Sequence, residues 1–136
     1  MNAQELHVSL PPIPPSISVA RRIVRDAAGD LPSSVVGDAE LLTSELVTNA
    51  IRYGGRSIEL FAERVDNLLT VAVSDDGAEL PSTTETGPAA DAVSGRGLRI
   101  VEQVARDWGI RTEENRPGKT VWFRVAAEDG QGGPGR

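Results

Sequence analysis

The sequence predicts a two-layer α/β (α+β) sandwich, in which a mixed, mostly antiparallel sheet carries three helices on one face. The expected order of elements is strand, helix, helix, strand, strand, a long irregular segment, helix, strand, strand. Two pairs of expected strands are joined by short turns and therefore form antiparallel hairpins. Each expected helix has one apolar face, which it can bury against the sheet.

Length and composition limit the class of protein. The 136 residues suit one domain, and no apolar run approaches the roughly 20 residues that span a bilayer. The N-terminus has no secretory pattern and the chain has no cysteine, so we expect a cytoplasmic protein without disulfides or a membrane partner. The net charge of -6 disfavours direct binding to nucleic acid. The single histidine, His7, disfavours a Ser-His-Asp triad and a His-rich zinc site.

The first half of the chain is expected to hold a short strand and two helices. Residues 1–15 form an N-terminal segment with a strand at Glu5 to Leu10, and prolines then prevent regular structure until Ser16. The first helix runs to about Ala28 and the second from after Pro32 through Tyr53, ending at Gly54. The expected capping residues are Ser16 or Ser18 for the first helix, and Ser33, Ser34 or Asp38 for the second.

The first helix has a clear division between an apolar and a basic face. Its apolar face contains Val19, Ile23, Val24 and Ala27. Arg21, Arg22 and Arg25 are expected toward solvent, either as an ordinary solvated face or as a surface that contacts a partner protein.

The second half is expected to contain a hairpin, a lid, a helix and a second hairpin. The strands are residues 57–64 and 68–75, with a turn at Asp66-Asn67, and residues 110–114 and 120–126, with a turn at 115–118. Residues 76–96 lack periodicity, as in a functional lid or a disordered loop. The helix begins at Gly97, places Leu98, Val101, Val104, Ala105 and Trp108 on one face, and ends at Gly109. Residues 127–136 are expected to be disordered.

A polar pair interrupts the second helix. Glu45 and Asn49 are four residues apart, so they lie on one helical face beside the apolar row of Leu42, Leu46 and Ala50. Such a pair needs a partner if it is buried, and that partner is a hydrated metal ion, a phosphate or a neighbouring backbone. The alternative is a solvated flank of the helix.

Two further stretches suit ligand binding. Asp75-Asp76-Gly77 ends a strand, and Gly95-Arg96-Gly97 stands at a helix start, where free backbone N–H groups and glycines favour phosphate. Arg96 would add a charge-assisted contact. The Rossmann pattern is excluded because Ile100 occupies its third glycine position. A P-loop is excluded because Glu113 occupies the first glycine position before Gly118-Lys119-Thr120.

Four stretches together resemble the GHKL superfamily of ATPases. These are ELVTNA at 45–50, VSDDG at 73–77, SGRGLRIV at 94–101 and GKTVWF at 118–123, in the order and on the elements of that superfamily. More narrowly, the chain resembles the anti-sigma-factor serine kinases, in particular small stand-alone members from actinobacteria. The resemblance covers residues 16–126 and implies a single ATP-binding kinase domain of the Bergerat fold, with residues 76–96 as the ATP lid.

The resemblance implies a role for each matching residue. Asn49 would ligate the Mg²⁺ that bridges the ATP phosphates, and Glu45 would be the general base. Asp75 would accept a hydrogen bond from the adenine amino group, with Gly77 giving the base room and Thr120 lying near the adenine. The remaining residues implied in nucleotide binding are Gly95, Arg96, Gly97 and Leu98 at the phosphates and the lid hinge.

The implied function is that of an ATP-dependent protein serine kinase and anti-sigma factor. It would phosphorylate an anti-sigma-factor antagonist, sequester a sigma factor, and be able to form a homodimer. Two positions depart from the family pattern, because Glu79 and Val93 stand where glycines are usual. These departures suggest an alternative, an ATP-gated regulatory binding protein without significant kinase activity. Another alternative is a histidine-kinase-like catalytic domain that acts on a separate chain.

Overall fold

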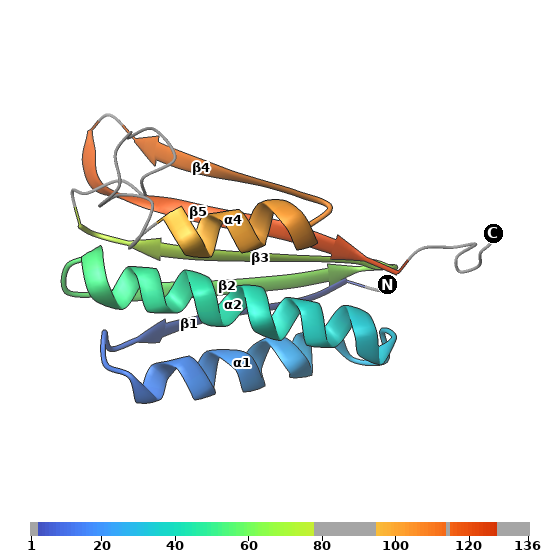
Figure 1. The fold of residues 1–136 in the computed structure, drawn as a ribbon. Helices are drawn as coiled ribbons and strands as arrows, with labels where there is room; N and C mark the ends of the chain where they lie inside the picture. The colour runs from blue at the N-terminus through green and yellow to red at the C-terminus, as the bar shows by residue number, and fades with distance from the viewer. Residues whose placement is uncertain (1–2, 78–94, 114, 128–136) are drawn as a thin grey trace.

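The structure, a computed structural model, describes residues 3–77, 95–113 and 115–127. These residues form a sheet covered on one face by helices (Figure 1). The strands are β1 (Ala3–Leu10), β2 (Ile58–Val65), β3 (Leu68–Asp75), β4 (Asp107–Glu113) and β5 (Arg116–Ala126), and the helices are α1 (Pro15–Ala28), α2 (Ser33–Tyr53) and α4 (Gly95–Val104). Helix α2 lies between α1 and α4. The predicted two-layer sandwich is confirmed.

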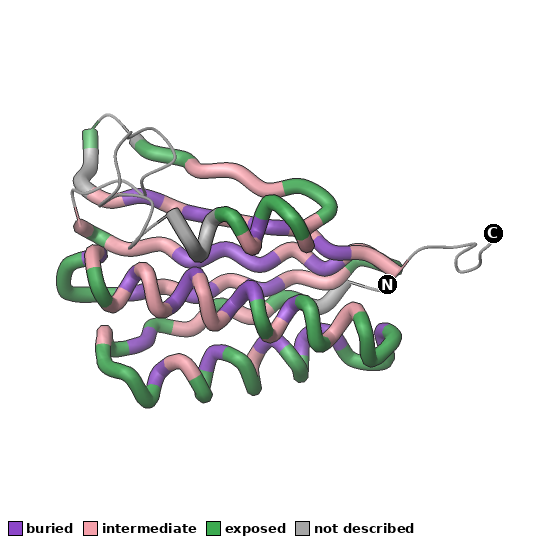
Figure 2. The backbone as a smooth tube through the Cα atoms, viewed as in Figure 1, coloured by how far each residue is buried: buried purple, intermediate pink, exposed green. Residues whose placement is uncertain are grey.

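The sheet has the strand order β1-β2-β3-β5-β4, and each of these neighbouring pairs is antiparallel. Alternate residues of each strand therefore face the helices. Ile58, Leu60 and Leu69 are fully buried there, together with Phe123 of β5. The core is the space between this face and the helices (Figure 2).

The helices bury nearly the predicted faces. On α2 the predicted row of Leu42, Leu46 and Ala50 is buried. On α1 Val24 and Ala27 are buried as expected, whereas Val19 is 39% exposed. The buried stripe of α1 is rotated from the predicted one and passes through Ala20 and Ala28, because small side chains allow α1 to pack closely.

The predicted side-chain caps were wrong. Proline occupies the N-cap position of both helices, Pro14 for α1 and Pro32 for α2, and neither helix has a side-chain cap hydrogen bond. The hydroxyl of Ser16 instead donates to the carbonyl oxygen of Pro11 at 2.7 Å. Ser16 thus fixes the proline-rich turn between β1 and α1 rather than the helix terminus.

The predicted extent of the third helix was also wrong. Helix α4 begins at Gly95 and ends at Val104, and the N–H of Arg106 already donates to the carbonyl of Arg124 in β5 at 2.8 Å. Trp108 lies in β4, directly opposite Phe123. Its apolar side chain packs on the core from a strand, because cross-strand pairing replaces the helical hydrogen bonds after residue 105.

Several predicted features fall outside the described residues. These include most of the lid, with Glu79 and Val93, and residues 128–136 of the tail. The predicted domain limits at residues 16 and 126 stay predictions. In the described part of the chain, no helix is long and apolar enough to cross a membrane.

Candidate functional site

The predicted site residues come from four elements that end or begin at the same edge of the molecule. In Figure 1 the C-terminal ends of α2 and β3 and the N-terminal ends of α4 and β5 all lie at the left of the view. Asn49, Asp75, Gly95 and Thr120 are therefore brought to one end of the two-layer fold. The sequence separates these positions by up to 71 residues, from 49 to 120.

Glu45 and Asn49 lie on the flank of α2 that faces α4. The opposite flank is marked by Glu40, which binds Arg21 and Arg25 of α1. Since each residue turns by about 100° around a helix axis, Glu45 and Asn49 lie roughly 140° and 180° from Glu40. Both are partly exposed on this flank.

The carboxamide of Asn49 has an unsatisfied buried atom. Its Nδ2 is buried and has no hydrogen-bond partner among the residues that the structure describes. An unpaired buried donor costs about 1–3 kcal/mol, so a ligand that pairs with it would recover free energy. Rotating the carboxamide by 180° exchanges its nitrogen and oxygen, which offers either a donor to a phosphate or an oxygen to Mg²⁺.

The carboxamide oxygen of Asn49 is a ligand type that suits Mg²⁺ when a nucleotide and water supply the other ligands. The described residues contain no group of three or more His, Cys, Asp or Glu that could hold a metal ion. Mg²⁺ in nucleotide sites commonly takes one or two protein ligands and completes its shell with phosphates and water. Asn49 would supply the oxygen from this chain.

Asp75 is a buried carboxylate at the end of β3. Its side chain is 3% exposed and faces the helix layer, in register with Val73 and Val71. Oδ1 accepts hydrogen bonds from the backbone N–H of Gly77 and from Nζ of Lys119, each at 2.9 Å. Burial raises the pKa of Asp75, and the bonds from Lys119 and Gly77 oppose that rise. Such a hydrogen-bond acceptor suits a nucleotide base that carries an amino group.

The two residues after Asp75 fix the chain beyond β3. Asp76 accepts hydrogen bonds from the N–H groups of Arg56 and Ser57, at 2.8 and 3.2 Å, and these bonds lower its pKa. Gly77 leaves no room for a side chain, because a Cβ there would lie 2.5 Å from the carbonyl carbon of Gly54. The end of α2 and the end of β3 are thus locked together at the site.

The side chain of Thr120 lies on the opposite face of the sheet from the side chain of Asp75. Because side chains alternate along a strand, Thr120 points to the face that the helices leave open, and its Oγ1 lies 2.6 Å from Oγ of Ser74. The residue of β5 opposite Asp75 is Lys119. Sequence reasoning missed Lys119, although its alternation with the apolar Val121 and Phe123 would have placed it inward.

The stretch Gly95–Leu98 forms the first turn of α4. Its backbone therefore has the N–H groups that attract phosphate at a helix N-terminus. The side chains of Arg96 and Leu98, predicted as phosphate contacts, lie outside the described residues. Helix α4 packs against α2, and its first turn lies toward the same side of the view as the C-terminal end of α2 (Figure 1). The role of Gly95 and Gly97 stays a prediction.

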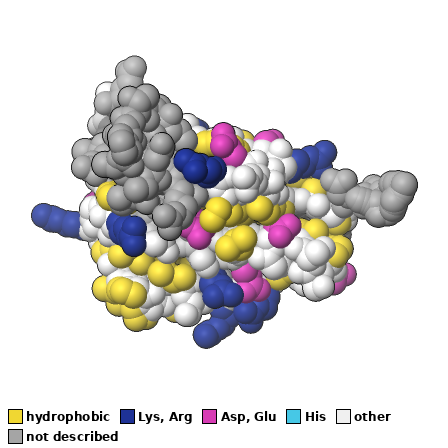
Figure 3. Space-filling view, in the orientation of Figure 1, with side chains coloured by type: hydrophobic (Ala, Val, Ile, Leu, Met, Phe, Trp, Pro, Cys, Tyr) yellow, Lys and Arg dark blue, Asp and Glu magenta, His cyan; other side chains and the backbone are white. Residues whose placement is uncertain are grey.

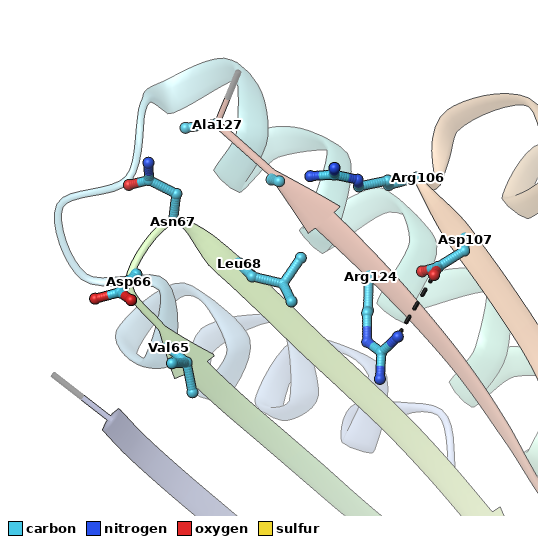
Figure 4. A pocket seen from close by; sticks show the side chains of 9 residues that line it. Val65, Asp66, Asn67, Leu68, Arg106, Asp107, Arg124 and Ala127 are labelled. Carbon is cyan, nitrogen blue, oxygen red and sulfur yellow. Dashed lines mark hydrogen bonds and ion pairs between the residues drawn. The ribbon is translucent and has the colours of Figure 1, made fainter. Parts of the chain in front are cut away.

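A separate hollow of about 500 Å³ lies at the other end of the sheet, near the turn between β2 and β3 (Figure 4). Its lining includes Leu68, Arg106 and Arg124, and Arg124 binds Asp107 at 3.4 Å across it. None of the predicted site residues lines this hollow. It is therefore distinct from the cluster around Asp75.

Comparisons with known proteins agree with the observed fold. A family described as "Histidine kinase-like ATPase domain" matches residues 10–125. Among solved structures, the chain is similar to the histidine kinase domain of the blue-light activated histidine kinase from Erythrobacter litoralis EL346, with 21% identity and a TM-score of 0.53. That match covers 81% of this chain and 57% of the histidine kinase chain. This chain therefore spans little more than half the length of the histidine kinase chain. No curated protein matches.

Proposed function

Since the chain belongs to the family of histidine kinase-like ATPase domains, we propose that it is a protein serine kinase that binds Mg-ATP at the end of β3. We further propose that it phosphorylates an anti-sigma-factor antagonist and sequesters a sigma factor. Membership of the family implies ATP binding. The serine specificity and both partners rest on the sequence resemblance to anti-sigma-factor serine kinases.

The observation that carries the nucleotide site is the buried carboxylate of Asp75. It stands on the helix side of the sheet, and both of its described hydrogen bonds end on Oδ1. An ionised carboxylate accepts hydrogen bonds and donates none, so it pairs with the exocyclic amino group of adenine. Asn49, with its unsatisfied Nδ2, lies at the same end of the fold, where the phosphates would extend.

Phosphoryl transfer would use Glu45 as the general base. In this step the serine oxygen attacks the γ-phosphorus, Glu45 takes the hydroxyl proton, and the bond to ADP breaks. Mg²⁺, when bound, neutralises charge on the phosphates. The N-terminal turn of α4 would bind the phosphates through its N–H groups. Positioning and electrostatic stabilisation then supply most of the rate.

A protein partner would contact the surface of α1 and α2. Figure 3 shows basic and acidic side chains gathered over these helices. Arg21 and Arg25 are engaged with Glu40, while Arg22 is exposed and takes no part in these contacts. We propose Arg22 as the first of the three to test for partner contact. The cytoplasm is the proposed location.

A histidine-kinase-like activity on a separate chain is the second candidate, favoured by the fold of the solved structure described above. The chain's own His7 is a poor acceptor, because it lies on the uncovered sheet face and its Nε2 is 3.0 Å from Glu59. An acceptor histidine would have to come from another protein.

The test is transfer of labelled γ-phosphate to purified antagonist proteins encoded in the same genome. Serine phosphate survives acid and histidine phosphate does not, so acid treatment distinguishes the two candidates. Replacing Glu45 with Gln should lower transfer by about 10²–10⁴-fold while ATP affinity stays within a few fold. Acid-labile product alone, or unchanged transfer in the Gln variant, would overturn the serine kinase proposal. ATP binding without transfer would favour the ATP-gated regulator.

A further inference from the structure

Lys119 and Asp75 form an ion pair that is almost completely removed from water. Their side chains are 5% and 3% exposed, and Nζ lies 2.9 Å from Oδ1. A buried charge is costly unless it is paired, and removing one partner leaves the other uncompensated. One member of this pair, Asp75, is the residue that would bind the adenine base in the proposed function.

The backbone around the pair is shaped to hold it. Lys119 and Asp75 are directly opposite in the register of β3 and β5. Gly118 has a φ of 111°, and a Cβ there would collide with the carbonyl oxygen of Asp75. On the helix side, a Cβ on Gly54 would lie 2.7 Å from Cγ of Asp75. Gly118 therefore packs on the backbone of Asp75, and Gly54 packs on its side chain.

The two oxygens of this carboxylate are used differently. Lys119 and the N–H of Gly77 both bind Oδ1, and within the described part of the chain no donor to Oδ2 is found. We propose that Lys119 is a positioning residue that sets base specificity, because it occupies Oδ1 and leaves Oδ2 as an acceptor for an amino group. This inference rests on the proposed nucleotide site.

The charge on the carboxyl group of Asp75 decides how well the site distinguishes adenine from hypoxanthine. An ionised Oδ2 accepts from the 6-amino group of adenine and repels the 6-carbonyl oxygen of hypoxanthine. A protonated carboxyl can donate as well as accept, so it tolerates the carbonyl. Burial raises the pKa of Asp75 and neighbouring Asp76 adds to the rise, while Lys119 and Gly77 oppose it. At the C-cap of α2, the uncharged Gly54 lies next to the carboxyl group.

The experiment compares the dissociation constants of Mg-ATP and Mg-ITP, which differ at this position of the base, from pH 6 to pH 9. The wild-type protein should prefer ATP by about tenfold or more across the range. In Lys119→Met and Lys119→Gln the carboxyl group stays protonated to higher pH, so the preference should fall near pH 6 and return as the pH rises. Lys119→Arg, which keeps the charge, should retain the preference at each pH.

Asp75→Asn is the matched control, because its carboxamide does not titrate. It should show little preference at any pH, and the double variant Asp75→Asn/Lys119→Met, which has no buried charge, should do the same. Unchanged preference in both neutral Lys119 variants, or a loss that higher pH does not reverse, would overturn the assignment of Lys119. A wild-type protein that binds neither nucleotide would instead overturn the nucleotide site itself.

Discussion

The backbone of Gly77 packs directly against that of Gly54, so that the chain leaving β3 and the end of α2 share one close contact. A Cβ on Gly77 would lie 2.5 Å from the carbonyl carbon of Gly54 and 2.7 Å from its oxygen. This contact holds Asp75 near the helix that carries Glu45 and Asn49. The two halves of the candidate site are therefore mechanically coupled.

Replacing Gly77 with Ala should destabilise the protein and weaken ATP binding together. The added methyl group must displace backbone, at a cost of about 1–3 kcal/mol in the free energy of unfolding. Gly37 is the matched control, because a Cβ there meets nothing within 4 Å. Gly37→Ala should stabilise α2 by up to about 1 kcal/mol and leave ATP affinity unchanged. Denaturant unfolding and ATP titration of both variants check this. Equal effects of the two substitutions would contradict the coupling.

Glu40 should stabilise the packing of α1 on α2 in a pH-dependent way. It binds Arg25 at 2.9 Å and Arg21 at 3.4 Å, and its side chain is 13% exposed. The hydrogen bond from Arg25 lowers the pKa of Glu40 below the ordinary 4.5. The folded state thus holds the ionised form more tightly, so this stabilisation is complete above pH 4.5 and is lost as the pH falls through the lowered value.

The corresponding substitution is Glu40→Gln. It should cost about 1 kcal/mol of unfolding free energy at pH 7, and the difference from wild type should shrink toward zero in acid. Denaturant unfolding over a series of pH values measures this difference. Glu102→Gln, on the exposed surface of α4, is the control and should stay within about 0.5 kcal/mol of wild type. A Glu40 effect that persists at acid pH would show that packing, not charge, is responsible.

We expect Asn49 to strengthen the binding of Mg-ATP without stabilising the ligand-free protein. Because Nδ2 is buried and has no partner in the described part of the chain, Asn49→Ala should leave the ligand-free protein as stable as wild type or more stable by up to about 1 kcal/mol. Mg-ATP affinity should nevertheless fall at least about tenfold. Thr43 carries the other buried side-chain atom without a partner among the described residues, so Thr43→Val should also stabilise but leave affinity unchanged. If Asn49→Ala instead unfolds more easily than wild type, its role is structural.

Local patterns predicted most of the fold. The apolar row of Leu42, Leu46 and Ala50 identified the buried face of α2 correctly, since it is a regular repeat within one element. Trp108 shows where local patterns cannot decide between a helix and a strand. Its spacing from Val104 suits a helix and its spacing from Ile110 suits a strand, and the choice is made by pairing with Phe123, which is distant in sequence. The exposed Val19 likewise reflects how α1 rotates on its neighbours.

The candidate site was likewise predicted where local patterns decide and missed where distant strands pair. The i, i+4 spacing of Glu45 and Asn49 placed them on one face of α2, and the strand ending at Asp75 was predicted correctly. The partner of Asp75 was not, because the register of β3 against β5 decides that Lys119 rather than Thr120 lies opposite it. A shift of one residue would have exchanged their faces. Non-local register is therefore the information that a single sequence lacked.

We propose that the buried carboxylate of Asp75 and the carboxamide of Asn49 belong to one Mg-ATP site. The most direct measurement is calorimetric titration of Mg-ATP into the wild-type protein and the Asp75→Asn and Asn49→Ala variants, with Glu102→Gln as the control. We predict that wild type and the control bind one ATP per chain and that each site variant loses at least about tenfold in affinity. No binding by the folded wild-type protein, or unchanged affinity in Asp75→Asn, would contradict the account.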